Sequence, residues 1–198
     1  LPVRIHGLDL KTEVIEHCSA LAERCGYMDL DFAEGNIGDH PLPDSTGMMV
    51  CLHACNTATD LAIAQAVRAQ VPIIFAVPCC QHELYAQLKT RKETFRTEDH
   101  LLLPLMEHGI ITERFASLLT DTVRALLLQA CGYTVQIMEF IETEHTPKNI
   151  LIHAVKKTQS AGQAERLKET ALRQYRRIKE SFCIEPTLEK LLHYAVSE

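Results

Sequence analysis

Short apolar runs alternate along the chain with longer segments whose apolar residues recur every three to four positions. The short runs predict β-strands, because continuous apolar stretches of this length are typical of buried strands. The longer segments have the spacing of amphipathic helices. The expected strands cover residues 3–10, 30–37, 48–55, 71–78, 133–141 and 148–157. The expected helices cover residues 11–26, 56–70 and 112–132, part of 81–103, and two segments of 160–198.

The order of these elements indicates an α/β fold. Strands and helices alternate in the first 80 residues, which is typical of a parallel sheet covered by helices. The last two strands are joined by the short link ETEHTP, so we expect them to pair as an antiparallel hairpin. We expect residues 1–158 to form this domain and residues 159–198 to form a helical extension packed on it.

Composition and charge then limit the classes of protein. The 198 residues are 46% apolar and 23% charged, as in a folded globular domain, and the net charge of −6 argues against a general polyanion binder. No apolar run is long enough to cross a membrane, and the first residues lack a signal-peptide pattern. The eight cysteines are therefore expected to be mostly reduced thiols in a cytoplasmic protein.

Cysteine and histidine gather where two neighbouring strands are expected to end. The stretch CLHAC holds Cys51, His53 and Cys55, and VPCCQHEL holds two adjacent cysteines followed by a histidine. Because the carboxyl ends of parallel strands share one edge of a sheet, these side chains could converge there. Thiolate and imidazole are zinc ligands, although the spacing is not that of a C-x₂-C site. The residues alone leave open a metal site, a redox or nucleophilic thiol, and a pocket wall facing a substrate; we favour the wall, without metal.

Three motifs in order carry a resemblance to a known family. They are LHACNTATDLAI, then VPCCQHEL, then HTPKNILIHA, and the tail IEPTLEKLL adds to them. The chain resembles class I S-adenosylmethionine (SAM) dependent methyltransferases. Within that family it looks like a subgroup that includes domains labelled as ribosomal-RNA-adenine-dimethylase-like and the domain of the glutathione S-transferase C-terminal-domain-containing protein.

The resemblance implies a Rossmann-like, doubly wound, mostly parallel sheet with helices on both faces and an antiparallel last strand. The central first strand and its glycine-rich loop would lie before Val3, and no G-x-G-x-G occurs in this chain. Without that strand, two half-sheets would expose unpaired edges. We therefore expect that an N-terminal segment of a longer polypeptide, or a second copy in a homodimer, completes the sheet.

The resemblance also implies a SAM-binding role for residues after the first two strands. Asp9 would bind the ribose hydroxyls, and Leu10 would pack on one face of the adenine. Asn36 and Ile37 would meet the adenine amine and ring. The alternatives are plain: Asp9 interacting with the dipole of the following helix, and Gly35-Asn36 forming an ordinary turn.

The next two strand ends would face the methyl group and its acceptor. His53 is expected near the methyl donor or substrate, and Pro78, Cys79 and Cys80 would form the pocket wall that positions the acceptor. Methyltransferases that modify amino groups often carry an acid or Asn before this proline, where the chain has Val77, so methylation of a base amine is in doubt. His53 or His82 would serve as a general base if one is needed.

The remaining polar candidates lie further along the chain. Lys148 and Asn149 border the substrate side in the resembling subgroup, and a capped hairpin turn is the alternative. Asp60 would either orient His53 or decorate its helix, and the helix from 115 to 131 is expected to be plain core. The tail has a basic run that could contact RNA phosphates or form a solvated helix face, at Arg166, Lys168, Arg173, Arg176, Arg177 and Lys179.

The sequence thus predicts a SAM-dependent methyltransferase whose acceptor is unidentified, RNA being one candidate. In-line displacement at the sulfonium methyl would be aided mainly by alignment and desolvation. Two alternatives stay open: a binding module that kept the fold without turnover, and a zinc or redox protein that uses the cysteine–histidine group.

Overall fold

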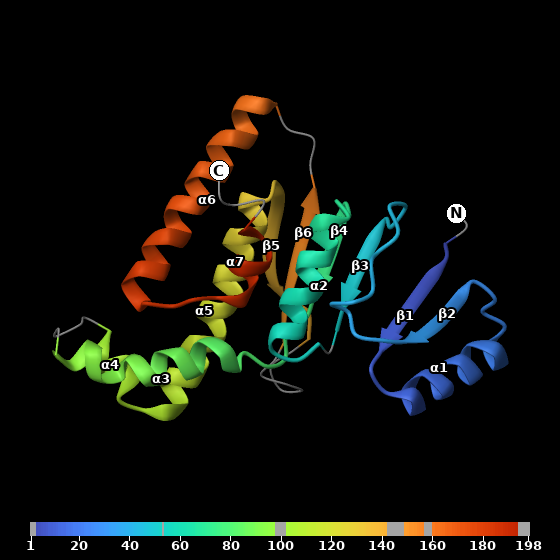
Figure 1. Ribbon diagram of the computed structural model, residues 1–198, viewed down its shortest axis with the longest axis horizontal. Helices are drawn as coiled ribbons and strands as arrows, with labels where there is room; N and C mark the ends of the chain where they lie inside the picture. Colours follow the sequence, from blue (N-terminus) through green and yellow to red (C-terminus); the bar gives the residue numbers. More distant parts are fainter. Residues whose placement is uncertain (1–2, 53, 98–101, 142–148, 157–159, 194–198) are drawn as a thin grey trace. The chain divides into compact units, whose positions relative to one another are not determined.

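The computed structural model describes residues 3–52, 54–97, 102–141, 149–156 and 160–193 (Figure 1). Contacts within the chain divide it into two compact units, Leu1–Leu42 and Pro43–Glu198. The expected boundary near residue 158, between the sheet domain and a helical extension, differs from this division and stays a prediction.

The first unit is a strand–helix–strand motif. Strand β1 (Ile5–Asp9) pairs in parallel with β2 (Leu30–Glu34), so Asp9 and Glu34 lie side by side at the carboxyl ends. Helix α1 (Thr12–Cys25) connects them and ends at Gly26, which has the left-handed φ of 73° that closes a helix. The predicted helix stop at Gly26 is therefore confirmed.

Gly7 and Phe32 fix how closely the side chains of β1 and β2 pack. The two residues are partners in the parallel register, and the Phe32 ring lies over the space where Gly7 has no side chain. A Cβ added at Gly7 would overlap ring carbons of Phe32. This pair of strands can pack in this way because one of the two residues is glycine.

The second unit contains a four-stranded sheet in the order β3-β4-β6-β5. Strands β3 (Met48–Cys51) and β4 (Ile73–Ala76) are parallel, whereas the last strand, β6 (Ile150–Lys156), runs antiparallel to β4 and to β5 (Tyr133–Glu139). The predicted antiparallel pairing of the last two strands is confirmed. Placing β6 between β4 and β5 means that this hairpin folds back into the sheet (Figure 1).

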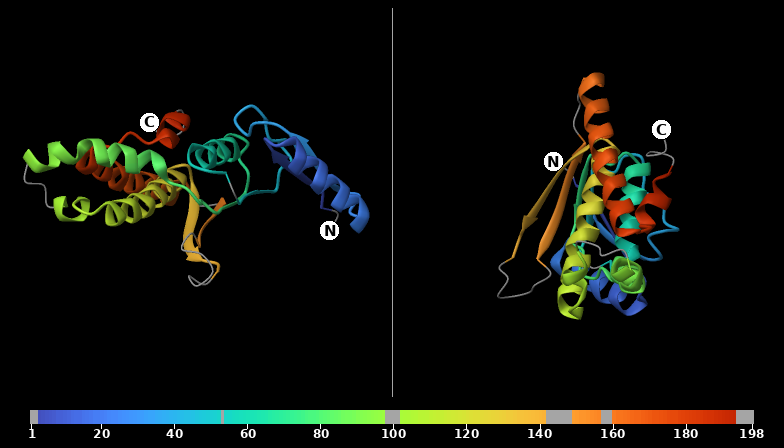
Figure 2. Two further views of the ribbon diagram at one scale, coloured as in Figure 1. Left: turned by 90° about the horizontal axis from the view of Figure 1, so that it is seen from below. Right: turned by 90° about the vertical axis from the view of Figure 1, so that its left-hand side faces the viewer.

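Helices pack against this sheet and against one another. They are α2 (Thr57–Arg68), α3 (His82–Thr97), α4 (Leu103–Met106), α5 (Gly109–Ala130), α6 (Ala161–Phe182) and α7 (Thr187–Leu191). Helix α5 contacts β5, α3 and α6, and α7 contacts α2, so the C-terminal helices belong to the core of this unit (Figures 1 and 2). Among the described helices, none has the length and apolarity needed to cross a membrane.

One face of the four-stranded sheet forms the centre of the core. The side chains of Ile74, Ala76, Ile152 and Ala154 share that face through the strand register, and each is completely buried. Burial on this scale removes most of their apolar surface from water, which is the main stabilising contribution in such a domain.

Strand β3 departs from the prediction in two ways. It was expected to extend to residue 55 as a fully buried strand, but it ends at Cys51 and its side chains alternate between exposed and buried. Met49 is 7% exposed, whereas Val50 is 54% exposed. One face of β3 lies in the core and the other does not, and the neighbouring β4 shows the same alternation between buried and half-buried side chains.

The chain is thus a mixed α/β structure with parallel strand pairs and packed helices. This architecture is compatible with a Rossmann-like methyltransferase fold.

Candidate functional site

Two loops meet at the carboxyl ends of β3 and β4. The first leads from β3 through Cys55 and Asn56 into α2, and the second leads from β4 through Pro78 and Cys80 into α3. The backbone N–H of Val77 donates to the Cys51 carbonyl at 2.8 Å, and that of Asn56 donates to the Cys80 carbonyl at 3.1 Å. These two bonds extend the pairing of the strands into the loops, as expected for an edge where ligands bind in open α/β sheets.

Three thiols converge between these loops, and we call Cys55, Cys79 and Cys80 the thiol cluster. Their Sγ atoms all lie within 4.8 Å of one another, and those of Cys55 and Cys79 are 3.3 Å apart. Cys55 is exposed, and Cys79 and Cys80 are half-buried. Burial, followed by hydrogen bonding to the two neighbouring thiols, raises the pKa of Cys79 to about 12. The described structure therefore brings together three of the cysteines that the sequence singled out.

Cys51 lies apart from this cluster. A strand over the expected residues 48–55 would place Cys51 and Cys55 on the same side, because side chains alternate along a strand. Because β3 ends at Cys51, the alternation does not reach residue 55, and Cys51 is buried while Cys55 is exposed. Burial raises the pKa of the Cys51 thiol, so Cys51 stays protonated and packs as a small apolar side chain in the core.

Asn56 holds the first loop in an unusual backbone conformation. Its φ of 54° and ψ of −122° are sparsely populated by residues other than glycine. Besides the bond to Cys80, its side-chain Oδ1 accepts from the Glu83 N–H at 3.1 Å, and its carbonyl accepts from Arg124 at 3.0 Å. The side chain makes no cap hydrogen bond to α2; it bonds instead to the first turn of α3 and so ties the two loops together.

A buried ion-pair network lies beneath these loops. The Arg124 guanidinium on α5 donates to both carboxylate oxygens of Asp60 at 2.8 and 3.0 Å, and to Asp121 at 3.1 Å. All three side chains are at most 4% exposed. Burial alone would lower the pKa of Arg124, but hydrogen bonds and charge from Asp60, and charge from Asp121, raise it above its ordinary value. A buried cation compensated by two acids in this way is stable only as a complete set.

Gln81 extends the network to the second loop. Its Nε2 donates to Asp121 at 3.1 Å and to the Pro78 carbonyl at 3.4 Å, and its Oε1 accepts from the Ser117 hydroxyl at 2.7 Å. We call Asp60, Asp121, Arg124 and Gln81 the buried polar network. It fixes the positions of both loops that carry the thiol cluster.

Sequence reasoning missed most of this network. Asp60 was expected to orient His53 or to lie on the outside of its helix. It is buried and pairs with Arg124, so the second alternative is wrong, and the first stays a prediction because His53 lies outside the described residues. Residues 115–131 are core as expected, but that core also holds the charged pair Asp121 and Arg124. The available signal was an acid and a base, Asp121 and Arg124, set among the leucines of α5 at a spacing that places them on one face.

A second set of polar groups lies at the carboxyl ends of β1 and β2. Asp9 is half-buried, and its Oδ1 accepts from the Lys11 N–H at 2.9 Å. Glu34, which sequence reasoning did not single out, accepts from the Thr12 hydroxyl at 2.5 Å. Asn36 is exposed, and its Oδ1 accepts from the Gly38 N–H at 3.1 Å in a local turn. Both alternatives noted above, a helix-start acid and an ordinary turn, thus correspond to observed hydrogen bonds.

The other predicted residues have mixed outcomes. His53 and Lys148 lie outside the described residues. Leu10 is 70% exposed, Ile37 is half-buried, and His82 is exposed at the start of α3.

Asn149 has a structural explanation. It is buried, its side chain donates to the Ile141 carbonyl at 2.9 Å, and its own carbonyl accepts from Phe140 at 3.2 Å. These bonds close the β5–β6 hairpin, in line with the hairpin alternative for this position.

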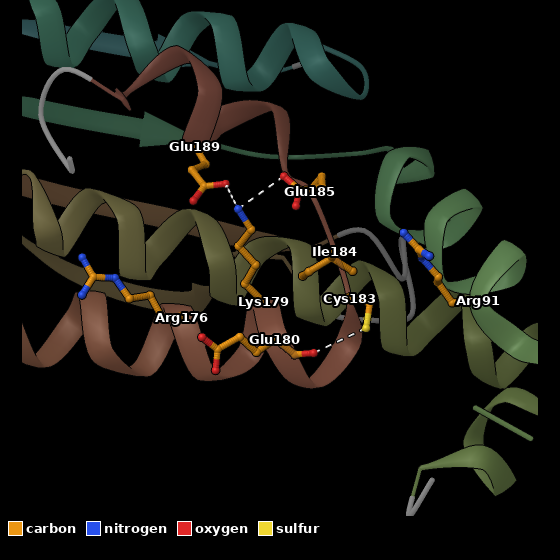
Figure 3. Close-up of a pocket in the computed structure, with 8 residues that line it drawn as sticks. All are labelled: Arg91, Arg176, Lys179, Glu180, Cys183, Ile184, Glu185 and Glu189. Carbon is orange, nitrogen blue, oxygen red and sulfur yellow. Dashed lines mark hydrogen bonds and ion pairs between the residues drawn. The ribbon is translucent and has the colours of Figure 1, made fainter. Parts of the chain in front are cut away.

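A separate hollow of about 470 Å³ is lined by residues of α3, α6 and α7 and of the segment between α6 and α7 (Figure 3). It is lined by Arg91, Arg176, Lys179, Glu180, Cys183, Ile184, Glu185 and Glu189. Lys179 of the basic run pairs with Glu189 at 2.7 Å and with Glu185 at 3.3 Å, so part of its positive charge is compensated locally. Arg176 and Lys179 of the basic run line this hollow, whereas the candidate SAM-binding and pocket-wall residues are not among its lining residues.

Comparison with known proteins finds a family for the first part of the chain. Residues 1–87 match the family model of a methyltransferase domain. The match supports a methyltransferase family. It spans β1 to the beginning of α3 and so includes Asp9, Asn36 and the whole thiol cluster.

More distant similarity extends beyond that match. Two proteins, each named glutathione S-transferase C-terminal domain-containing protein, from Homo sapiens and Macaca fascicularis, are 26% identical to this chain over 56% of its length. The chain spans about a fifth of the length of these curated relatives, 20% in each case. No solved structure matches the chain. The subgroup inferred from the three motifs stays a prediction.

The carboxylates at the ends of β1 and β2 are suited to bind the ribose of SAM. A ribose offers two hydroxyl donors, and Asp9 with Glu34 places two carboxylate acceptors on adjacent strands. One oxygen of each carboxylate already accepts a hydrogen bond that orients it. The chemistry of these side chains therefore suits the cofactor that the methyltransferase family generally uses.

Proposed function

We propose that this chain forms part of a SAM-dependent methyltransferase. The observation that carries the proposal is the match of residues 1–87 to a methyltransferase domain, which includes the polar groups at the ends of four strands. The strand pairs β1–β2 and β3–β4 are both parallel, and open α/β sheets bind their ligands at the carboxyl ends of such strands.

The first unit would hold the nucleoside part of the cofactor. Asp9 would accept from the ribose hydroxyls, with Glu34 beside it, while Leu10 and Ile37 would contact the adenine ring. Asn36 would offer its amide to the exocyclic amine. Bound SAM supplies an electrophilic methyl group on a sulfonium; the protein's part is to orient the cofactor and exclude water.

The loops after β3 and β4 would face the acceptor. Pro78, Cys79 and Cys80 would form the wall against which the acceptor is aligned, and the buried polar network would keep that wall rigid. The acceptor nucleophile loses its proton to His53, to His82 or to water. His53 would also lie next to the methyl donor.

The acceptor proposed is RNA. Support comes from the subgroup resemblance and from exposed Arg166, Arg173, Arg176 and Arg177 on α6. Lys148 and Asn149 would border the substrate, although the Asn149 amide is already engaged in the hairpin. A further strand, from a preceding segment of the same polypeptide or from a second copy, would pair with β3.

SAM binding measured by calorimetry tests the proposal. Residues 1–198, alone and with any preceding residues that the gene encodes, would be titrated, together with Asp9→Asn and a matched control, Asp29→Asn, at the opposite end of β2. Loss of a charged hydrogen bond costs about 1.5–3 kcal/mol, so Asp9→Asn should weaken binding roughly tenfold or more. Asp29→Asn should leave it unchanged.

Two outcomes would contradict the proposal. If neither chain binds SAM, the methyltransferase function is wrong. If SAM binds without methyl transfer to any RNA, protein or small-molecule acceptor, the binding-module alternative would replace it.

A further inference from the structure

We propose that the thiol cluster is a binding site for a thiophilic cation, Zn²⁺ in the first instance, held by the Sγ atoms of Cys55, Cys79 and Cys80. The site is built entirely within the second unit. It does not depend on the proposed methyl transfer, and it goes beyond the pocket wall that we favour from the sequence.

The sulfur positions are close to those that a bound ion requires. Zinc–sulfur bonds are about 2.3 Å long, and tetrahedral angles then place two sulfur ligands about 3.8 Å apart. The Cys55 and Cys79 sulfurs are 3.3 Å apart, and none of the three pairs exceeds 4.8 Å. The required spacing lies within this range, so small side-chain rotations would seat the ion without moving the backbone.

The loops that carry the thiols are fixed before any ion binds. The Asn56 N–H bonds the Cys80 carbonyl, and the Asn56 side chain bonds the start of α3. The strained backbone at Asn56 is maintained by these bonds and by Arg124. Strain of this kind costs of order 1–3 kcal/mol and persists where the surroundings over-determine it, typically at functional sites.

Burial and the neighbouring thiols raise the pKa of Cys79 to about 12, whereas two helix N-termini lie close to the other two cysteines. Cys55 lies two residues before α2 begins at Thr57, and Cys80 lies two residues before α3 begins at His82. Helix N-termini stabilise nearby negative charge and favour the thiolate form of cysteine. Each thiol releases its proton to solvent as the ion binds.

The ligand type selects the class of ion. Soft sulfur ligands favour zinc and monovalent copper, whereas magnesium and calcium prefer oxygen. In the part of the chain that the structure describes, no His, Asp or Glu joins the three cysteines within ligand distance. Because Cys55 is exposed, a water molecule can take the fourth position of a tetrahedral zinc.

The test uses the full polypeptide purified under reducing conditions. Zinc content would be measured by mass spectrometry, and cobalt substitution would report sulfur ligands by their charge-transfer absorption. Cys55→Ser and Cys79→Ser should lose at least tenfold in zinc affinity. Cys183→Ser, which removes an exposed free thiol of the same unit outside the cluster, should bind as the wild-type protein does.

X-ray absorption of the zinc-loaded wild-type protein keeps the test independent of variants that fold poorly. Three sulfur neighbours per zinc would support the site. Absence of a bound ion, or affinity unchanged in Cys55→Ser, would overturn it. Formation of a Cys55–Cys79 disulfide on exposure to oxidised glutathione, with no zinc bound by the reduced protein, would replace it with the redox alternative. All of these measurements are made without SAM, so their failure is distinct from failure of the methyltransferase proposal.

Discussion

At the scale of single residues, Arg124 is the buried charge on which the fold of the second unit depends. It is 1% exposed and compensates two buried carboxylates, those of Asp60 and Asp121. Removing one member of such a set leaves charge buried without a partner, which is far more costly than losing an exposed ion pair.

We therefore expect Arg124→Met to lower the free energy of unfolding by about 3–5 kcal/mol. The measurement is urea denaturation followed by circular dichroism. Arg114→Met is the matched control, because Arg114 is exposed on the same helix and should change stability by less than about 0.5 kcal/mol. Equal stability of the two variants would show that Asp60 and Asp121 do not need this cation.

At the scale of secondary-structure elements, the sequence predicted what local pattern decides. Helix α1 stops at Gly26 because only a left-handed residue closes it there, and the β5–β6 hairpin follows from two apolar runs with a short link. The Asp60–Arg124 pair was not predictable in this way. Its members are 64 residues apart, and the periodicity of a helix does not show which residue of another helix its charged side chain will contact. The end of β3 at Cys51 was also missed, because the apolar run continues past it.

The packing of β1 on β2 gives a prediction at this scale. Gly7→Ala places a methyl group into the Phe32 ring, and overpacking of this kind costs about 1–3 kcal/mol. Hydrogen exchange should therefore become faster in residues 5–9 and 30–34. Gly47→Ala, where an added Cβ meets open space, is the control. Phe32→Leu combined with Gly7→Ala should recover part of the protection, and a Gly7→Ala protein with unchanged exchange would refute the close packing.

At the scale of the whole molecule, the question is what lies against the exposed side of β3. Met48 and Val50 of β3, and Leu52 directly after it, are each more than half exposed although the segment is apolar. If a further strand or helix of a longer polypeptide covers this side, these side chains become core residues there. If nothing covers it, they stay at the surface in every context.

Two neighbouring residues of β3 distinguish these cases. In residues 1–198, Met49→Ala should cost about 2–5 kcal/mol because Met49 is buried, whereas Val50→Ala should cost less than about 0.5 kcal/mol. In the longer polypeptide the cost of Met49→Ala should be the same. There the cost of Val50→Ala should rise above 1 kcal/mol, since large-to-small changes in a core lose both transfer energy and packing. A negligible cost of Val50→Ala in both chains, measured by denaturant unfolding, would mean that no additional element covers this face of β3.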